Sequence, residues 1–450
     1  MARRERNVVH MTEGSLWKNI MFFSVPLMLS QILEVLFNLS DVAVVGKFSG
    51  YTALGAVGST SLLVTLYTGF LIGMGSGVTV RTAHSLGSHN EEKTKKTVYS
   101  AFIVCVIVGL IVMLFGLVMS GRLLEILKTK DELIAQAKLY LMIYSCGMPA
   151  LAIYNYGNGV LSAVGDTKRP LIYLTIAGIL NVILNLFFVI VCGKAADGVA
   201  IASVISQYVS ALLILNNLFR REDFCKLHMD KDNFDEDACK EVVMIGLPAG
   251  VQNAIFGIAN LFVQSGVNSF DAILVSGNSA AANADNIIYT GMAAFHTACS
   301  SFMSQNYGAK KKDRVLKSYF VSLFYSFMTG AILGGALLIF GRQFLSVFSN
   351  EQAVITAGME RLKIMGWSYC ISAFMDCTIA ASRGIGKSIP PMIIVIMGSC
   401  VFRIIWIYTV FAHFHTITSL YLLYSFSWTI TSIAEICYFV YAYRKTVKPL

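Results

Sequence analysis

Four polar side chains with the clearest capacity for chemistry lie in the first long apolar run of the chain. They are Gln31, Glu34, Asn38 and Asp41. Their spacings of three, four and three positions place them on one face of an α-helix. A charge near the bilayer centre costs ~2.5–3.5 kcal/mol, so acids kept there are candidates for binding a proton or a cation. The alternative for Asp41 is a position near the outer interface, where a charge costs less.

A proline precedes this polar face, and the same pattern returns in the second half of the chain. Pro26 removes one backbone hydrogen bond and allows the helix to bend. The residues that follow Pro248 on one face are Asn253, Asn260, Gln264 and Asn268. Proline-interrupted helices at matching positions of two repeats predict a central substrate site. Amide side chains also join neighbouring helices, and for Asn253 and Asn268 both interpretations stay open.

Other apolar runs also carry polar residues. Asn181 and Asn185 are one helical turn apart, and either packing or function explains them. Asp376 shares a face with two serines spaced by four, and it is a second acid able to bind a proton or a cation. The alternative is a pairing with Arg383. Isolated ionisable residues are weaker candidates, since each could be a packing partner: Asp285, His296, Arg403 and Glu435.

The composition indicates an all-α integral membrane protein. Of 450 residues, 56% are hydrophobic and only 14% charged, against about a quarter charged in ordinary globular chains. Apolar runs of roughly 20 residues, enough to span a bilayer, recur along the chain. Ten cysteines lie without a C-x-x-C pair, which argues against a disulfide framework or a zinc site.

The apolar runs predict twelve transmembrane helices. They cover residues 17–45, 52–80, 97–120, 133–161, 170–192, 197–219, 241–269, 273–304, 316–341, 353–382, 389–412 and 416–443. With a cytoplasmic N-terminus, 25 of the 35 Lys and Arg fall in inside segments and six in outside loops. This asymmetry predicts that both termini are cytoplasmic. It also explains the net charge of +9 without a nucleic-acid partner.

The two halves of the chain repeat. Pro26 and Pro248 are 222 positions apart, and so are the Tyr-Thr-Gly triplets that begin at Tyr67 and Tyr289. A six-helix unit returns the chain to its starting side, so two such units are related by an axis along the membrane normal. We therefore predict two six-helix repeats around a central cavity. The parts are an N-lobe at 1–219, a cytoplasmic linker at 220–240 and a C-lobe at 241–450.

Three stretches resemble the multidrug and toxic compound extrusion (MATE) family. They are Pro26 to Asp41-x-x-x-x-Gly46, the turn Gly165-Asp-Thr-Lys-Arg-Pro170, and Asp376-x6-Arg383-Gly384-x-Gly386-Lys387-Ser388. The resemblance covers essentially the whole chain. It implies a V-shaped pair of six-helix lobes, alternating access, and export of organic cations in exchange for protons or sodium ions. It implies a transporter without a cofactor.

The resemblance also implies roles for individual residues. Asp41 matches the coupling aspartate of the family's first helix, and Asp376 matches its tenth-helix aspartate. Polar residues implied around Asp41 are Tyr140, Asn181, Asn185 and Ser203. To these the helical face adds Asn38 and Glu34 for coupling. Gln31 and the four amides after Pro248 would line the substrate cavity.

Two departures from the family pattern bear on the coupling ion. The NorM-like branch has a glutamate soon after the seventh-helix proline, where this chain has Ala254, Ile255 and Phe256. Asn185-Leu186 stands where many relatives have Asp-Pro. A missing carboxylate should weaken a sodium site more than a protonation site. The sequence therefore favours the DinF-like branch and proton coupling.

We expect a secondary active antiporter in which neutralisation of Asp41 bends the first helix at Pro26. Motifs for ATP-driven or hydrolytic chemistry are absent from the sequence. An integral-membrane enzyme would need paired carboxylates or a metal cluster, and none is evident. The alternative is a flippase for a lipid-linked precursor, which would need a more cationic cavity. We expect a monomer in a bacterial plasma membrane, in contact with lipid.

Overall fold

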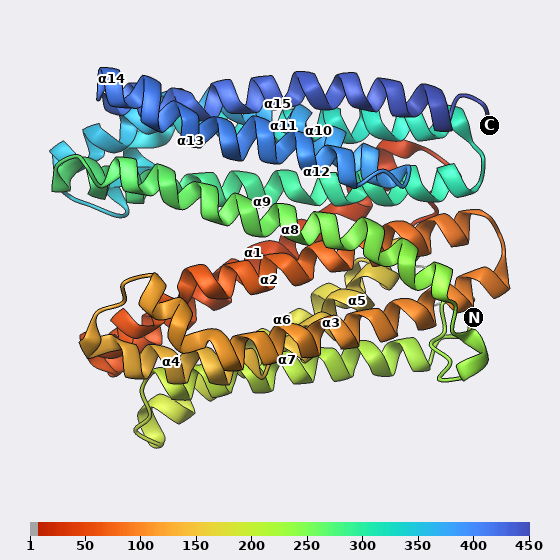
Figure 1. Ribbon diagram of the computed structural model, residues 1–450, viewed down its shortest axis with the longest axis horizontal. Coiled ribbons are helices and arrows are strands. Elements are labelled where there is room, and N and C mark those ends of the chain that lie inside the picture. The colour runs from red at the N-terminus through yellow and green to blue at the C-terminus, as the bar shows by residue number, and fades with distance from the viewer. Residues whose placement is uncertain (1–7) are drawn as a thin grey trace. The chain divides into compact units, whose positions relative to one another are not determined.

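The computed structural model describes residues 8–450, and all regular structure in that range is helical (Figure 1). The α-helices are α1 Leu16–Phe48, α2 Gly50–Gly87, α3 Glu91–Ile126, α4 Asp131–Ser145, α5 Met148–Val164, α6 Lys168–Leu186, α7 Ala196–Phe219, α8 Glu236–Val267, α9 Ala272–Gly308, α10 Lys312–Ser346, α11 Gln352–Gly384, α12 Ile389–Val395, α13 Phe402–Trp406, α14 Ala412–Phe414 and α15 Ile417–Thr446. The N-terminal arginines used to predict orientation (Arg3, Arg4 and Arg6) lie outside the described residues.

The twelve predicted helices correspond to twelve helical segments, three of which are subdivided. The predicted helix at 170–192 continues from α6 into a π-helical turn at Phe187–Val191. The predicted helix at 133–161 is divided into α4 and α5. Pro149 lies in the first turn of α5, where a missing N–H costs no hydrogen bond. The last segment but one runs through α12, α13 and α14 with π-helical turns at Ile396–Val401 and Ile407–Phe411. Within residues 8–450, nine helices are long and apolar enough to span a membrane. The all-α membrane fold is confirmed.

The chain forms two compact units. Unit 1 contains Leu29–Ala254, and unit 2 contains His10–Met28 and Ile255–Leu450. The chain therefore changes unit inside α1 shortly after Pro26, and again inside α8 shortly after Pro248. The predicted N-lobe, linker and C-lobe follow the sequence repeat, and their boundaries stay a prediction.

Within unit 1, glycines bring the first half of α8 against α2. A Cβ at Gly77 would lie 2.6 Å from both the Gly246 nitrogen and the Val242 oxygen. A Cβ at Gly250 would lie 2.7 Å from the Phe70 oxygen. Small residues four apart on a membrane helix allow this backbone approach, which maximises van der Waals contact.

Within unit 2, the start of α1 is held by α9 and α10. The rings of Phe23 and Phe302 pack edge to face with centroids 5.5 Å apart. Asn306 donates a side-chain hydrogen bond to the carbonyl of Met11, 3.1 Å away. Arg314 donates to the same carbonyl, also at 3.1 Å. These contacts fix the chain immediately before α1.

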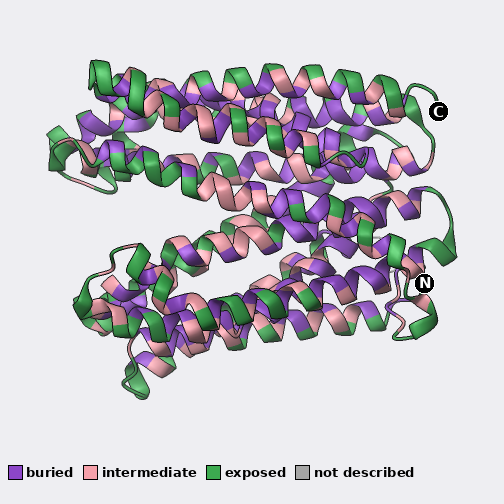
Figure 2. Ribbon diagram, viewed as in Figure 1, coloured by how far each residue is buried: buried purple, intermediate pink, exposed green. Residues whose placement is uncertain are grey.

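Large apolar side chains remain exposed along the helices (Figure 2). Val118 is 75% exposed, Ile339 73% and Trp367 72%. Soluble proteins rarely expose extended apolar surface, whereas lipid tails cover such surface without cost. We therefore expect these exposed apolar residues to include the faces that contact the bilayer.

Candidate functional site

The polar groups that converge most closely lie around Asp41 in unit 1. Asn185 of α6 donates through Nδ2 to Asp41 Oδ1 at 2.5 Å, and Ser203 of α7 donates to Asp41 Oδ2 at 3.1 Å. Asn185 Nδ2 also reaches Asn181 Oδ1 at 3.2 Å, and Asn181 Nδ2 donates to Ser203 at 3.3 Å. Four side chains from α1, α6 and α7 thus form a closed hydrogen-bonded ring on one carboxylate.

A glycine in α6 allows α1 to approach closely enough for this ring. A Cβ at Gly178 would overlap the ring of Phe37. Phe37 lies one turn before Asp41, and Gly178 lies about two turns before Asn185. The ring of Phe37 therefore occupies the space that any larger residue would fill, and the two helices meet at the carboxylate.

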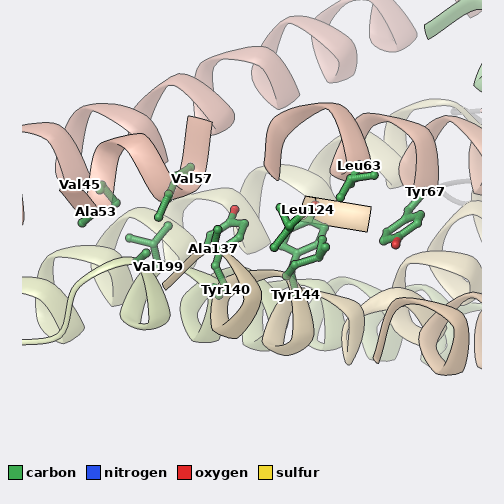
Figure 3. Packing of buried hydrophobic residues seen from close by; sticks show 14 of the residues in the cluster. Val45, Ala53, Val57, Leu63, Tyr67, Leu124, Ala137, Tyr140, Tyr144 and Val199 are labelled. Carbon is green, nitrogen blue, oxygen red and sulfur yellow. The ribbon is translucent and has the colours of Figure 1, made fainter. Parts of the chain in front are cut away.

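Tyr140 closes the apolar side of this site. It is 5% exposed and stacks on Tyr144 with ring centroids 5.9 Å apart. Figure 3 shows Tyr140 packed beside Val57 and Val199, which belong to the same buried cluster. The charge of Asp41 acts electrostatically on the hydroxyl group of Tyr140. No hydrogen bond joins the two side chains in the described part of the chain.

The other polar residues of α1 are not part of the ring. Glu34 and Asn38 are exposed, and neither makes a side-chain hydrogen bond within residues 8–450. The Oε1 atom of Gln31 is buried and also lacks a partner in that range. The helical face predicted from the sequence exists, but only Asp41 is joined to other elements through it.

The amide residues after Pro248 are divided between the two units. Asn253 lies in unit 1 and donates to the carbonyl of Gly69 on α2 at 3.0 Å. Asn260, Gln264 and Asn268 lie in unit 2, where Gln264 donates to Asn268 at 2.9 Å. Asn253 thus makes the packing contact that was one of its two interpretations. The cavity assignment of all four stays a prediction.

The two prolines predicted to bend helices lie inside continuous helices. Pro26 is in α1 and Pro248 is in α8. Neither helix is interrupted at its proline, and the helix-bending role stays a prediction.

Asp376 in α11 has a different environment from Asp41. Its Oδ2 atom is buried without a hydrogen-bond partner in the described residues. Arg383 and Arg403 are the opposite charges that act on it. The charge of Arg383 thus acts on Asp376, and a direct pairing of the two side chains stays an open alternative.

Sequence reasoning did not identify one buried ionic cluster in unit 2. Arg361 of α11 binds Asp285 of α9 and donates to Asn278 at 2.7 Å, and Tyr369 also donates to Asp285. The guanidinium lies 5.3 Å from the ring centre of Tyr421. Asn278 and Asp285 are seven positions apart and share a helix face, a signal that could have revealed the cluster. Among residues 8–450, no group of three or more His, Cys, Asp or Glu side chains is placed to hold a metal.

The arrangement matches a known family in both halves of the chain. A sequence model described as MatE matches residues 26–187 and again 248–409, the second match starting 222 positions after the first. The chain belongs to the MatE family. It is a MATE transporter rather than an enzyme, and the internal repeat predicted from the sequence is confirmed.

Two similar curated proteins come from bacteria. One is the probable multidrug resistance protein YoeA of Bacillus subtilis (strain 168), 25% identical over 398 residues that cover 86% of this chain and 85% of the relative. Another is an FAD transporter of Shewanella oneidensis, 24% identical over 342 residues and covering 74% of each chain.

Solved structures show the same fold. A crystal structure of MATE in complex with MaL6 has a TM-score of 0.90 and 21% identity, and covers 98% of this MATE chain and 99% of its own. A MOP superfamily transporter from Pyrococcus furiosus, described as having a binding pocket of reverse polarity, has a TM-score of 0.89 and 21% identity, with 96% and 97% coverage.

Proposed function

We propose that this MATE transporter is a secondary active antiporter that exports organic cations in exchange for protons or sodium ions. The observation that carries the proposal is the hydrogen-bonded carboxylate of Asp41. Asn185 and Ser203 both donate to it, and hydrogen bonds of this kind stabilise the ionised form of an acid. An ionised acid in a membrane helix attracts either a cationic substrate or a coupling cation. Asp41 therefore serves as the coupling residue.

The contacts of Asp41 favour a proton over sodium as the coupling ion. Both polar neighbours present hydrogen atoms to the carboxylate rather than oxygen lone pairs. Sodium would require the Asn185 amide to turn its oxygen toward the carboxylate and the Ser203 hydroxyl to turn its hydrogen away. A protonated Asp41 becomes a donor, and the Oδ1 atom of Asn185 is buried without a partner in the described residues. Asn185 can thus accept the new hydrogen bond after a rotation of its amide.

The mechanism follows from the difference between these two states. When Asp41 is ionised, the site can hold an organic cation. When a proton arrives from outside, Asp41 becomes neutral and its attraction for the cation is lost. The bend at Pro26 then accompanies release. We place this cycle in a bacterial plasma membrane, in a lipid-embedded monomer of the DinF-like branch with both termini cytoplasmic.

The test compares wild type with Asp41→Asn in cells that lack their own efflux pumps. We expect wild type alone to lower ethidium accumulation, and a protonophore to abolish the difference. Asp41→Asn keeps the shape of the side chain but cannot ionise. Equal accumulation in wild type, variant and empty vector, with both proteins present in the membrane, would contradict the proposal and direct attention to lipid-linked substrates.

A further inference from the structure

A second charged site lies in unit 2, around Arg403 of α13. The side chain is 1% exposed and is among the largest fully buried side chains of the described residues. It lies near the middle of the membrane segment that runs from α12 to α14. A guanidinium at this depth is costly, and such residues are functional candidates when they are retained.

Arg403 is held without a carboxylate partner. Its Nη1 donates to Asn260 Oδ1 at 2.8 Å, and its Nε donates to Ser427 at 3.4 Å. The guanidinium carbon lies 4.7 Å from the ring centre of Tyr424 and 5.5 Å from that of Phe256. Within residues 8–450 no acid forms an ion pair with it. The two aromatic faces and the two hydrogen bonds keep the charge in place without neutralising it.

Arg361 in the same unit is a buried arginine whose charge is neutralised, and it serves as a comparison for Arg403. Asp285 pairs with it directly, and Tyr369 completes the hydrogen bonding of that carboxylate. Arg403 has Asp376 only as a more distant opposite charge. Arg361 and Arg403 thus differ in one respect that matters for binding: an acid is paired with Arg361, and none is paired with Arg403 in the described residues.

Asn260 joins the buried Arg403 to the surface of the protein. Asn260 is exposed, and its carbonyl oxygen is occupied by the guanidinium. Its amino group is therefore directed away from Arg403 and makes no hydrogen bond in the described residues. Gln264, one turn further along α8, and Asn268, just after the end of α8, are also exposed, and the carbonyl oxygen of Asn268 is occupied by Gln264. The exposed amino groups of Asn260 and Asn268, eight residues apart, form a strip of two hydrogen-bond donors, of which Asn260 is backed by the positive charge of Arg403.

We propose that this strip binds the anionic oxygens of a substrate, such as a carboxylate or a phosphate. The exported molecules would then include zwitterions and anions as well as simple cations, a refinement that rests on the proposed transport function. A hydrogen bond from an amide backed by a guanidinium recognises a carboxylate much better than its uncharged ester. Asn260 touches the anion, and Arg403 positions and polarises Asn260.

The test uses a rhodamine with a free carboxylate and its methyl ester as matched probes. Binding to the purified protein in phosphatidylcholine nanodiscs is followed by fluorescence polarisation. We expect wild type to bind the free acid more tightly than the ester. Arg403→Gln should weaken binding of the acid about tenfold and change binding of the ester by less than about twofold. Arg444→Gln removes an exposed arginine of the same unit and should change neither.

Asn260→Asp covers the case in which Arg403→Gln fails to fold. The new carboxylate would pair with Arg403, which stabilises the buried charge and removes the preference for the acid. Adding phosphatidylglycerol to the nanodiscs identifies the source of the anion. Competition that depends on Arg403 indicates a lipid phosphate, and its absence indicates a soluble substrate; either result supports the anion site.

Three outcomes would overturn the proposal. They are absence of acid binding, an equal loss of both probes in Arg403→Gln, and a preference for the acid that survives in Asn260→Asp. An equal loss would show that Arg403 only joins helices. These results are independent of the transport test. Asp41-dependent export of the ester could persist even when Arg403 and Asn260 do not bind the acid.

Discussion

Substituting Gly77 by alanine tests how closely α2 and α8 must approach. The added Cβ would lie 2.6 Å from two backbone atoms of α8, those of Gly246 and Val242. Favourable contacts between heavy atoms begin at about 3.5 Å, so the helices would have to move apart by about 0.9 Å. Overpacking of this kind costs ~1–3 kcal/mol. Replacing a helical glycine by alanine returns about 1 kcal/mol of backbone entropy.

Gly58 provides a matched control in the same helix. A Cβ at Gly58 meets no atom of residues 8–450 within 4 Å, so Gly58→Ala receives the entropic gain without the clash. The two variants should therefore differ by the clash alone, ~1–3 kcal/mol. Thermal unfolding in one detergent should place Gly77→Ala below Gly58→Ala by about 2–4 °C for each kcal/mol. Equal melting temperatures would refute the close crossing.

Other contacts give predictions of the same kind. Ser203→Ala removes one donor to Asp41, and efflux of ethidium should fall by about ten- to a hundredfold, since a hydrogen bond to a charged group contributes ~1.5–3 kcal/mol; unchanged efflux would remove Ser203 from the coupling site. Pro26→Ala restores a helix hydrogen bond, so the melting temperature should rise while efflux slows; normal efflux would exclude the bending step. Arg361→Leu leaves Asp285 without its ion-pair partner and should lower the free energy of unfolding by ~3–5 kcal/mol. Most of this loss should be recovered in the double variant that also carries Asp285→Leu, as measured by thermal unfolding. A double variant no more stable than the single one would show that the pair is not coupled.

The helices could be predicted well because the bilayer imposes a simple rule. A membrane segment must satisfy its own backbone, so long apolar runs become helices of nearly the predicted extent. The break between α4 and α5 was missed, although Pro149 marks it. Sequence alone gives no reason to prefer a break over a bend at such a proline, because the choice depends on which helices pack against it.

The coupling site could be predicted only in part. Asn181 and Asn185 indicated a polar face on α6, but the hydrogen bond from Asn185 to Asp41 joins residues 144 positions apart. Spacing on one helix says nothing about such partners, and their assignment to one site came from the family resemblance. Glu34 and Asn38 satisfy the same spacing rule and yet join no other helix in the described residues. Helical periodicity identifies a face, whereas tertiary packing decides which members of that face are used.

Arg403 is the reverse case, a residue that was only a weak candidate in the sequence and that the structure places among several polar and aromatic contacts. A single arginine in an apolar run is a weak signal, and the family resemblance implied export of organic cations. The structure places that arginine against two aromatic rings, with an exposed amide above it. The rings come from α8 and α15, which are far apart in sequence. Only the fold could show that the charge is kept unpaired rather than cancelled.

The roles of Asp41 and Asp376 can be distinguished by the thermal stability of their variants as well as by the efflux that these variants support. Asp41 accepts two hydrogen bonds, so Asp41→Asn should lose efflux and should lower the melting temperature, because the amide cannot accept both donors at once. Asp376 buries an oxygen that accepts no hydrogen bond in the described residues, so Asp376→Asn removes an expensive charge. Its melting temperature should therefore stay equal to wild type or rise. Efflux by Asp376→Asn then shows which unit couples the ion. Retained efflux would assign coupling to Asp41 in unit 1. Abolished efflux in a protein of normal stability would show that unit 1 alone does not drive transport.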